Sequence, residues 1–271
     1  MTSTFDASPV PTAPGGTAAP EADAETARAA LALGDDALVL SHRLTEWAGD
    51  APVLEEEVAL ANLALDLLGQ ARNLYAIVGD EDALAFRREE REFRNLQLVE
   101  QPNGDFAHTI ARQLYFSVHR ELLYAELAGA DREHPRLAPI AAVAAKALPE
   151  LAYHRDHAAT WTVRLGDGTG ESTRRMRSAV DALWRYTGEL FEPIDGLPTG
   201  LIDPTAHRDA WLRRVGGVLE EARLALPDAG AAPDRDAWTA GAGRQGLHTE
   251  PFGRMLAEMQ HLHRSHPGAS W

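Results

Sequence analysis

The sequence contains no cysteine, and lysine occurs once, as Lys146, among 26 basic residues. Without cysteine the chain can form no disulfide and offers no thiolate ligand to a metal. Acidic residues outnumber basic ones by 41 to 26, which gives a formal net charge of -15. Because phosphate backbones are bound by clustered cations, this balance argues against nucleic acid as a partner.

Long apolar runs are also missing. No stretch approaches the ~20 apolar residues that a membrane-spanning helix needs, so we expect no membrane association through such a helix. The N-terminus has no basic segment followed by an apolar run, so we expect no secretory signal and a cytoplasmic location.

Signals for β-structure are scarce as well. No segment alternates apolar and polar residues with the β-branched composition of a strand. There is no glycine-rich phosphate loop after a strand and no Gly-x-Ser-x-Gly elbow. What the sequence does contain is helical periodicity, and we predict an all-α protein.

The chain divides into a tail and one predicted domain. Residues 1–24 are rich in Pro, Ala, Thr and Gly with little apolar bulk, which predicts a disordered tail. Residues 25–271 are predicted to form a single helical domain, with a core bundle over about 25–166 and extra helices over about 172–263. The Gly/Ala/Pro/Asp-rich stretch 227–246 is predicted to be a long loop.

Four long helices are predicted within the core. They cover about 25–47, 53–78, 105–129 and 139–165, and shorter helices are expected at about 82–94, 172–191, 204–226 and 251–263. The connections between the four long helices are short, long and short. This scheme is typical of two antiparallel hairpins with one long crossover, as in ferritin-like four-helix bundles.

Ferritin-like bundles often hold two metal ions. The ligands are a Glu from each of two helices and a Glu-x-x-His motif from each of the other two. In the helix at 53–78 the positions with the spacing of that motif carry Leu67 and Gln70. Leucine cannot coordinate a metal, and a neutral amide is a poor substitute for imidazole, so Asp66 is the one carboxylate left in the middle of this helix.

The other three helices supply only part of a ligand set. Glu150 and His154 lie four residues apart on the helix at 139–165, whereas the helix facing it has no Asp or Glu between positions 109 and 120. The first helix offers Asp35 and Asp36, whose role could equally be capping after a glycine. We therefore predict no metal site, no catalytic residue and no cofactor-binding residue. The remaining polar candidates are Asp36, Asp66, Glu150 and His154.

Three weaker features have ordinary explanations. Glu258 and His261 have ligand spacing on a short helix near the terminus, which favours a solvated face. Asp105, three residues before a histidine, is interpreted as favouring the start of a helix. Gly69 costs about 1 kcal/mol against alanine inside a helix, and we expect a neighbouring helix to approach it closely.

Several segments together resemble the C subunits of the bacterial phenylacetyl-CoA epoxidases. They are LGDDALVLSHRLTEW at 33–47, LEE at 54–56, NLALDLLGQARN at 62–73, DFAHTI at 105–110, Arg112-Gln113 and Tyr153-His154. The likeness covers most of the chain beyond the tail, and its first segment is distinctive.

This resemblance implies a ferritin-like subunit without a working di-iron centre. It implies a homologous catalytic A subunit that carries the iron, and a reductase subunit with flavin and an iron–sulfur cluster. Such an assembly epoxidises the aromatic ring of phenylacetyl-CoA with O2 and NADPH. The resemblance therefore implies no cofactor in this chain itself.

On that interpretation the polar residues of the second helix are structural. We expect Asn62, Asp66, Gln70 and Asn73 to hydrogen-bond to other helices, although part of this row could instead face a partner subunit. Possible partners of Asp66 or Asp36 are Arg43, Arg72 and Arg112.

Three hypotheses follow from the sequence. The first is a non-catalytic structural subunit of the ring-1,2-phenylacetyl-CoA epoxidase in aerobic phenylacetate degradation, which pairs with the di-iron A subunit. The second is an autonomous di-iron carboxylate oxygenase or ferroxidase. The third is a helical adaptor protein without a role in oxygenation.

Overall fold

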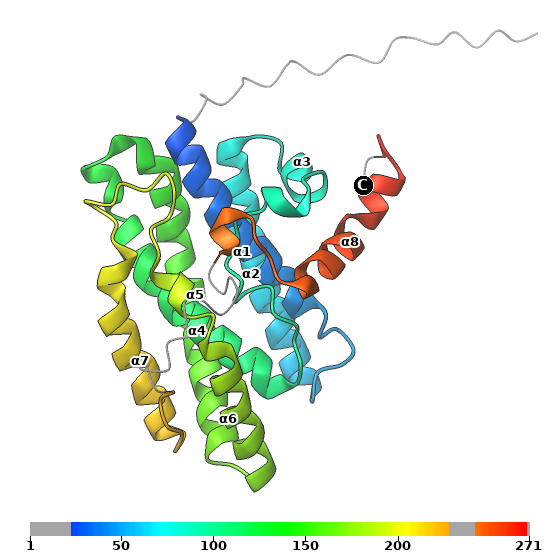
Figure 1. Ribbon diagram of the computed structural model, residues 1–271, viewed down its shortest axis with the longest axis vertical. Coiled ribbons are helices and arrows are strands. Elements are labelled where there is room, and N and C mark those ends of the chain that lie inside the picture. The colour runs from blue at the N-terminus through cyan, green and yellow to red at the C-terminus, as the bar shows by residue number, and fades with distance from the viewer. Residues whose placement is uncertain (1–22, 228–241, 270–271) are drawn as a thin grey trace, which may run out of the picture.

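The computed structural model describes residues 23–227 and 242–269, and every regular element in these two ranges is helical (Figure 1). This confirms the predicted all-α class. The predicted tail at 1–24 and the predicted loop at 227–246 lie mostly outside the described residues. No helix in the described ranges is both long and apolar enough to cross a membrane.

Two helical hairpins form the core. Helix α1 (Ala24–Thr45) packs against α2 (Leu54–Val78), and α4 (Phe106–Leu127) packs against α5 (Ala138–Gly166). The two hairpins meet through α2 and α5. The result is the predicted ferritin-like four-helix bundle with a long crossover between α2 and α4.

The additional helices form two groups, one packed on the α4–α5 hairpin and one near the end of α2 (Figure 1). Helices α6 (Gly170–Trp184) and α7 (Arg208–Glu221) both pack on the α4–α5 hairpin. Helix α3 (Glu81–Phe86) contacts the end of α2, and α8 (Glu250–Ser265) packs on α3.

Part of the crossover is buried and does not run over the surface. Residues 95–101 are all buried, and the backbone N–H groups of Arg94 and Leu96 donate to Asp35 Oδ2 (2.7 Å) and Asp36 Oδ1 (2.8 Å) on α1. These bonds hold residues 93–96, which form neither helix nor strand, against α1. The prediction of one helix over 82–94 is therefore wrong beyond Phe86, where α3 ends and only a 3₁₀ turn follows at Glu90–Glu92.

Two other predicted helices are shorter than expected. The helix expected at 172–191 ends at Trp184, because the Thr187 hydroxyl donates to the Trp184 carbonyl (2.8 Å) and the chain turns into a 3₁₀ segment. The helix expected at 204–226 becomes a 3₁₀ turn and then α7, which stops at Glu221. Arg223 follows with a φ of 57°, in the left-handed region that ends a helix.

Burial differs strongly between the core helices. About two thirds of the residues of α1 and nearly three quarters of those of α4 are buried. For α2 and α5 the buried share is about a third. The crossover covers α1 and the pair α6–α7 covers α4, so the outer side of α2 is left without a covering layer.

Candidate metal centre

The polar row on α2 divides into an inner and an outer half. Asp66 and Gln70 face α5: Asp66 Oδ2 lies 3.0 Å from His154 Nε2, and the Gln70 amide donates to Glu150 Oε2 at 3.0 Å. This confirms the predicted hydrogen bonding for two members of the row. Asn62 and Asn73 are exposed, and no hydrogen bond within the described residues joins them to another helix.

Leu67 lies in the buried core beside these polar pairs. Helix α5 adds a third cross-link to α2, in which His157 Nε2 lies 2.9 Å from Glu56 Oε2. The α2–α5 interface is thus held by three side-chain pairs, each of them one residue to one residue. None of the three brings two carboxylates and a histidine to a common point.

Asp36 on α1 is fully buried and lies in a separate cluster. Its Oδ2 accepts from Arg120 of α4 at 2.5 Å and from Arg244 at 2.7 Å. Arg244 comes from the segment before α8 and also donates to the carbonyls of Ala32 and Arg94. One carboxylate is therefore shared by two guanidinium groups that come from elements far apart in sequence.

The neighbouring Asp35 is satisfied in the same way. It pairs with Arg88 at 2.5 Å and accepts from the Tyr75 hydroxyl, also at 2.5 Å. Both aspartates lie in the middle of α1, so the alternative that they cap a helix is wrong. They are paired from the side by the crossover and by α4.

The predicted arginine partners of Asp36 and Asp66 are also wrong. Arg43 donates to the Glu100 carbonyl, and Arg72 pairs with Glu81 at the surface. Arg112 is fully buried and donates to the Gln101 carbonyl and the Asn103 side chain. Arg43 and Arg112 thus bind the crossover to the bundle, and Arg72 links α2 to α3.

The donor set does not fit a pair of metal ions. No group of three or more His, Asp or Glu side chains in the described parts of the chain could hold a metal. Asp36 would have to give up two arginines, Leu67 has no donor atom, and α4 contributes the cation Arg120 near the position where a carboxylate would be needed. The charge of Asp36 is thus balanced by two arginines of the chain itself.

Desolvation shapes the electrostatics around this cluster. Burial raises the pKa of Glu189 to about 7, although Arg244 beside it acts in the opposite direction. Its two oxygens accept from the backbone N–H groups of Gln97 (2.7 Å) and Arg244 (3.2 Å). Burial also lowers the pKa of Arg112 to about 9 and that of His119 well below its ordinary 6.5. All three shifts follow from the burial of these side chains.

A second buried pair lies where the crossover meets the segment before α8. His248 Nδ1 is 2.9 Å from Glu100 Oε2, and both side chains are fully buried. The Thr249 N–H donates to the other Glu100 oxygen at 2.6 Å. Sequence analysis missed this pair because its members are 148 residues apart, and no local spacing connects them.

The weaker candidates behave as ordinary structural residues. Asp105 caps α4 by accepting from the His108 N–H at 2.9 Å, as predicted. Glu258 and His261 are exposed. The expectation for Gly69 is wrong, since a Cβ placed there would meet nothing within 4 Å. The close approach occurs at Gly34, where a Cβ would lie 2.7 Å from Tyr75 Cε1.

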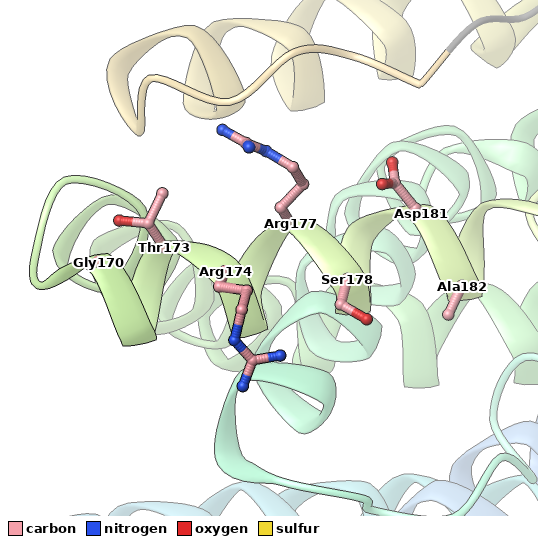
Figure 2. A pocket seen from close by; sticks show the side chains of 7 residues that line it. All are labelled: Gly170, Thr173, Arg174, Arg177, Ser178, Asp181 and Ala182. Atoms are coloured by element: carbon pink, nitrogen blue, oxygen red, sulfur yellow. The ribbon is translucent and has the colours of Figure 1, made fainter.

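An open groove runs along α6 (Figure 2). It has a volume of about 740 Å³ and is lined by Gly170, Thr173, Arg174, Arg177, Ser178, Asp181 and Ala182. Its two arginines are exposed and point in opposite directions, and Arg174 is tied to Glu171 at 2.7 Å. None of the seven residues that line it is buried, and we assign it no function.

Comparison with known proteins identifies the family of this chain. A family model described as "phenylacetic acid catabolic protein" matches residues 10–271. The chain is 46% identical over 253 residues to the C subunit of the 1,2-phenylacetyl-CoA epoxidase from Escherichia coli (strain K12), covering 89% of this chain and 97% of that protein. The chain belongs to the phenylacetic acid catabolic protein family.

Proposed function

We propose that this chain is a non-catalytic structural subunit of a multicomponent ring-1,2-phenylacetyl-CoA epoxidase, acting in aerobic phenylacetate degradation. It pairs with a homologous di-iron catalytic subunit and supports it. On this proposal the iron belongs to that partner, and the flavin, iron–sulfur cluster and NADPH belong to a reductase subunit. The similarity to the C subunit of such an epoxidase supports the assignment to this assembly.

One observation carries the non-catalytic part of the proposal. The buried carboxylate on α1, Asp36, is bound by Arg120 and Arg244, and α2 presents Leu67 and Gln70 where a ligand pair would stand. A buried carboxylate without a counter-charge is costly. The two guanidinium groups supply that charge permanently, so the bundle can stay folded without a metal.

The first test is the iron content of the purified chain. The chain is loaded anaerobically with excess Fe(II) and desalted, and we expect no retained iron. Retention of about two irons per chain, the content of a di-iron bundle, would instead establish an autonomous oxygenase or ferroxidase. The catalytic subunit, treated identically, is the positive control.

The second test is reconstitution. Phenylacetyl-CoA-dependent NADPH oxidation and product formation are measured with all subunits and then with this chain omitted. We expect turnover to be lost on omission and restored by adding the chain back. Unchanged turnover without it would favour a helical adaptor outside the oxygenation reaction.

A further inference from the structure

An apolar stripe runs along the uncovered side of α2. Leu54, Val58, Ala61, Leu65 and Leu68, called the α2 stripe below, recur every three or four residues and so share one face of the helix. All five are exposed, and Leu54 and Leu65 are 70% and 63% exposed. A helix normally turns such a row towards the core of its own protein.

The concentration of these side chains on one surface is unusual. Scattered exposed apolar residues are normal, whereas a contiguous patch marks an interaction site. Of the nine large hydrophobic residues exposed in the described ranges, five belong to the start or the stripe of α2, and Tyr153 lies on the adjacent α5. The other three are dispersed, one of them being Leu262 on α8.

A small cavity at Gly69, called the notch below, lies beside the α2 stripe. Gly69 leaves open space between α2 and α5, in a cavity of about 120 Å³. Gln70 and Glu150 line it together with Lys146, the single lysine of the chain. A side chain from another protein could enter it and find hydrogen-bonding groups there.

We propose that the α2 stripe and the notch at Gly69 form the surface on which this chain docks its catalytic partner, through a pair of helices of that partner. This inference rests on the proposed function. Rows spaced by three and four residues interlock with the rows of another helix, so the complementary surface is itself helical.

The size of the face agrees with such an interface. At a rise of 1.5 Å per residue the 25 residues of α2 span roughly 37 Å. With α5 alongside at a usual helix spacing, the face covers about 700 Å². Specific protein–protein interfaces bury about 600–1,000 Å² on each partner, so a face of this size lies within their range.

Charge favours a different protein over a second copy of this chain. Self-association would bring together two molecules that each carry a net charge of -15. Glu55 is exposed beside the start of the stripe, so acidic groups would also lie at the rim. Like charges placed opposite each other oppose association.

The test uses Leu65→Arg and a matched control, Leu262→Arg. The control changes the same residue type at a similarly exposed helical position, since Leu262 is 52% exposed. Each full-length variant is mixed with the catalytic subunit, and affinity is measured by surface-immobilised binding. Helix content and melting temperature, measured alongside, establish that both variants are folded.

We expect Leu65→Arg to weaken pairing at least about thirty-fold, as a charge in the centre of a buried interface does, and Leu262→Arg to leave it unchanged. Wild-type affinity in a folded Leu65→Arg variant would overturn the inference. So would a wild-type homodimer that this substitution dissociates, because the occupant would then be a second copy. Failure of the wild-type chain to bind the catalytic subunit at all would instead refute the proposed function.

Discussion

Asp36 and Asp66 are both carboxylates in the middle of long core helices, yet they lie in opposite surroundings. Asp36 on α1 has no exposed area and two arginine partners. Asp66 on α2 keeps 35% of its side chain exposed and pairs with one histidine. The α1–α4 side of the bundle is closed by buried ion pairs, whereas the α2–α5 side is held by single contacts and remains open.

This difference shows how one bundle can serve two purposes. The closed side needs its charges balanced internally, because ions removed from water cannot be compensated by solvent. The open side carries its apolar residues outward, where they add little to the stability of the isolated chain. The first side maintains the fold, and the second is available for a partner.

The largest expected effect is the difference in stability lost when each of the two aspartates is replaced by asparagine. Asp36→Asn leaves Arg120 and Arg244 without their carboxylate in a buried cluster, and we expect a loss of about 3–5 kcal/mol in the free energy of unfolding. Asp66→Asn keeps a hydrogen-bonding side chain at a partly exposed site, and we expect a loss of at most about 1 kcal/mol. Urea unfolding of both variants measures this. Equal losses would mean that the two sides do not differ in this way.

The parts of this picture that depend on local periodicity could be predicted from the sequence. The four core helices and their pairing follow from apolar spacing and connection lengths. Four-residue spacing places Asp66 and Gln70 on one face of their helix, and Glu150 and His154 on one face of theirs. It did not predict that these two faces meet. Leu67, which stands at a position with ligand spacing, is buried in the core.

The closed side could not be predicted in the same way. Arg120 and Arg244 reach Asp36 from 84 and 208 residues away, so no spacing on one helix indicates the contact. Residues 93–96 of the crossover are non-helical, and Asp35 and Asp36 accept the backbone N–H groups of Arg94 and Leu96 there, whereas the local sequence predicted a helix up to residue 94. Buried arginine pairing is a property of the tertiary structure.

An intermediate effect concerns pH on the closed side. Burial raises the pKa of Glu189 from 4.5 to about 7, so the folded protein holds a proton there that the unfolded chain releases. This contribution to stability is fully present below pH 4.5 and is lost as the pH rises to about 7. Glu189→Gln removes the titration. Relative to wild type, its free energy of unfolding should therefore rise by about 2 kcal/mol between pH 5.5 and pH 8.

The comparison of the two pH values isolates this effect. Glu189→Gln also changes one hydrogen bond, since Gln97 and Arg244 donate to both carboxylate oxygens. That loss is the same at both pH values and cancels in the difference. Stability curves that stay parallel from pH 5.5 to pH 8 would show that Glu189 is already ionised at the lower pH.

The smallest effect compares two glycines inside helices. Gly69→Ala on the open side meets no atom within 4 Å, so it should raise the free energy of unfolding by about 0.5–1 kcal/mol through helix propensity alone. Gly34→Ala on the closed side gains the same propensity but places its methyl group 2.7 Å from the Tyr75 ring. The Tyr75 ring is held in place by its hydrogen bond to Asp35 and cannot easily move away from the added methyl group. We therefore expect Gly34→Ala to lower the free energy of unfolding by about 1–2 kcal/mol. Thermal unfolding should show a higher melting temperature for Gly69→Ala and a lower one for Gly34→Ala. A stabilised Gly34→Ala variant would show that the α1–α2 contact is looser than the structure indicates.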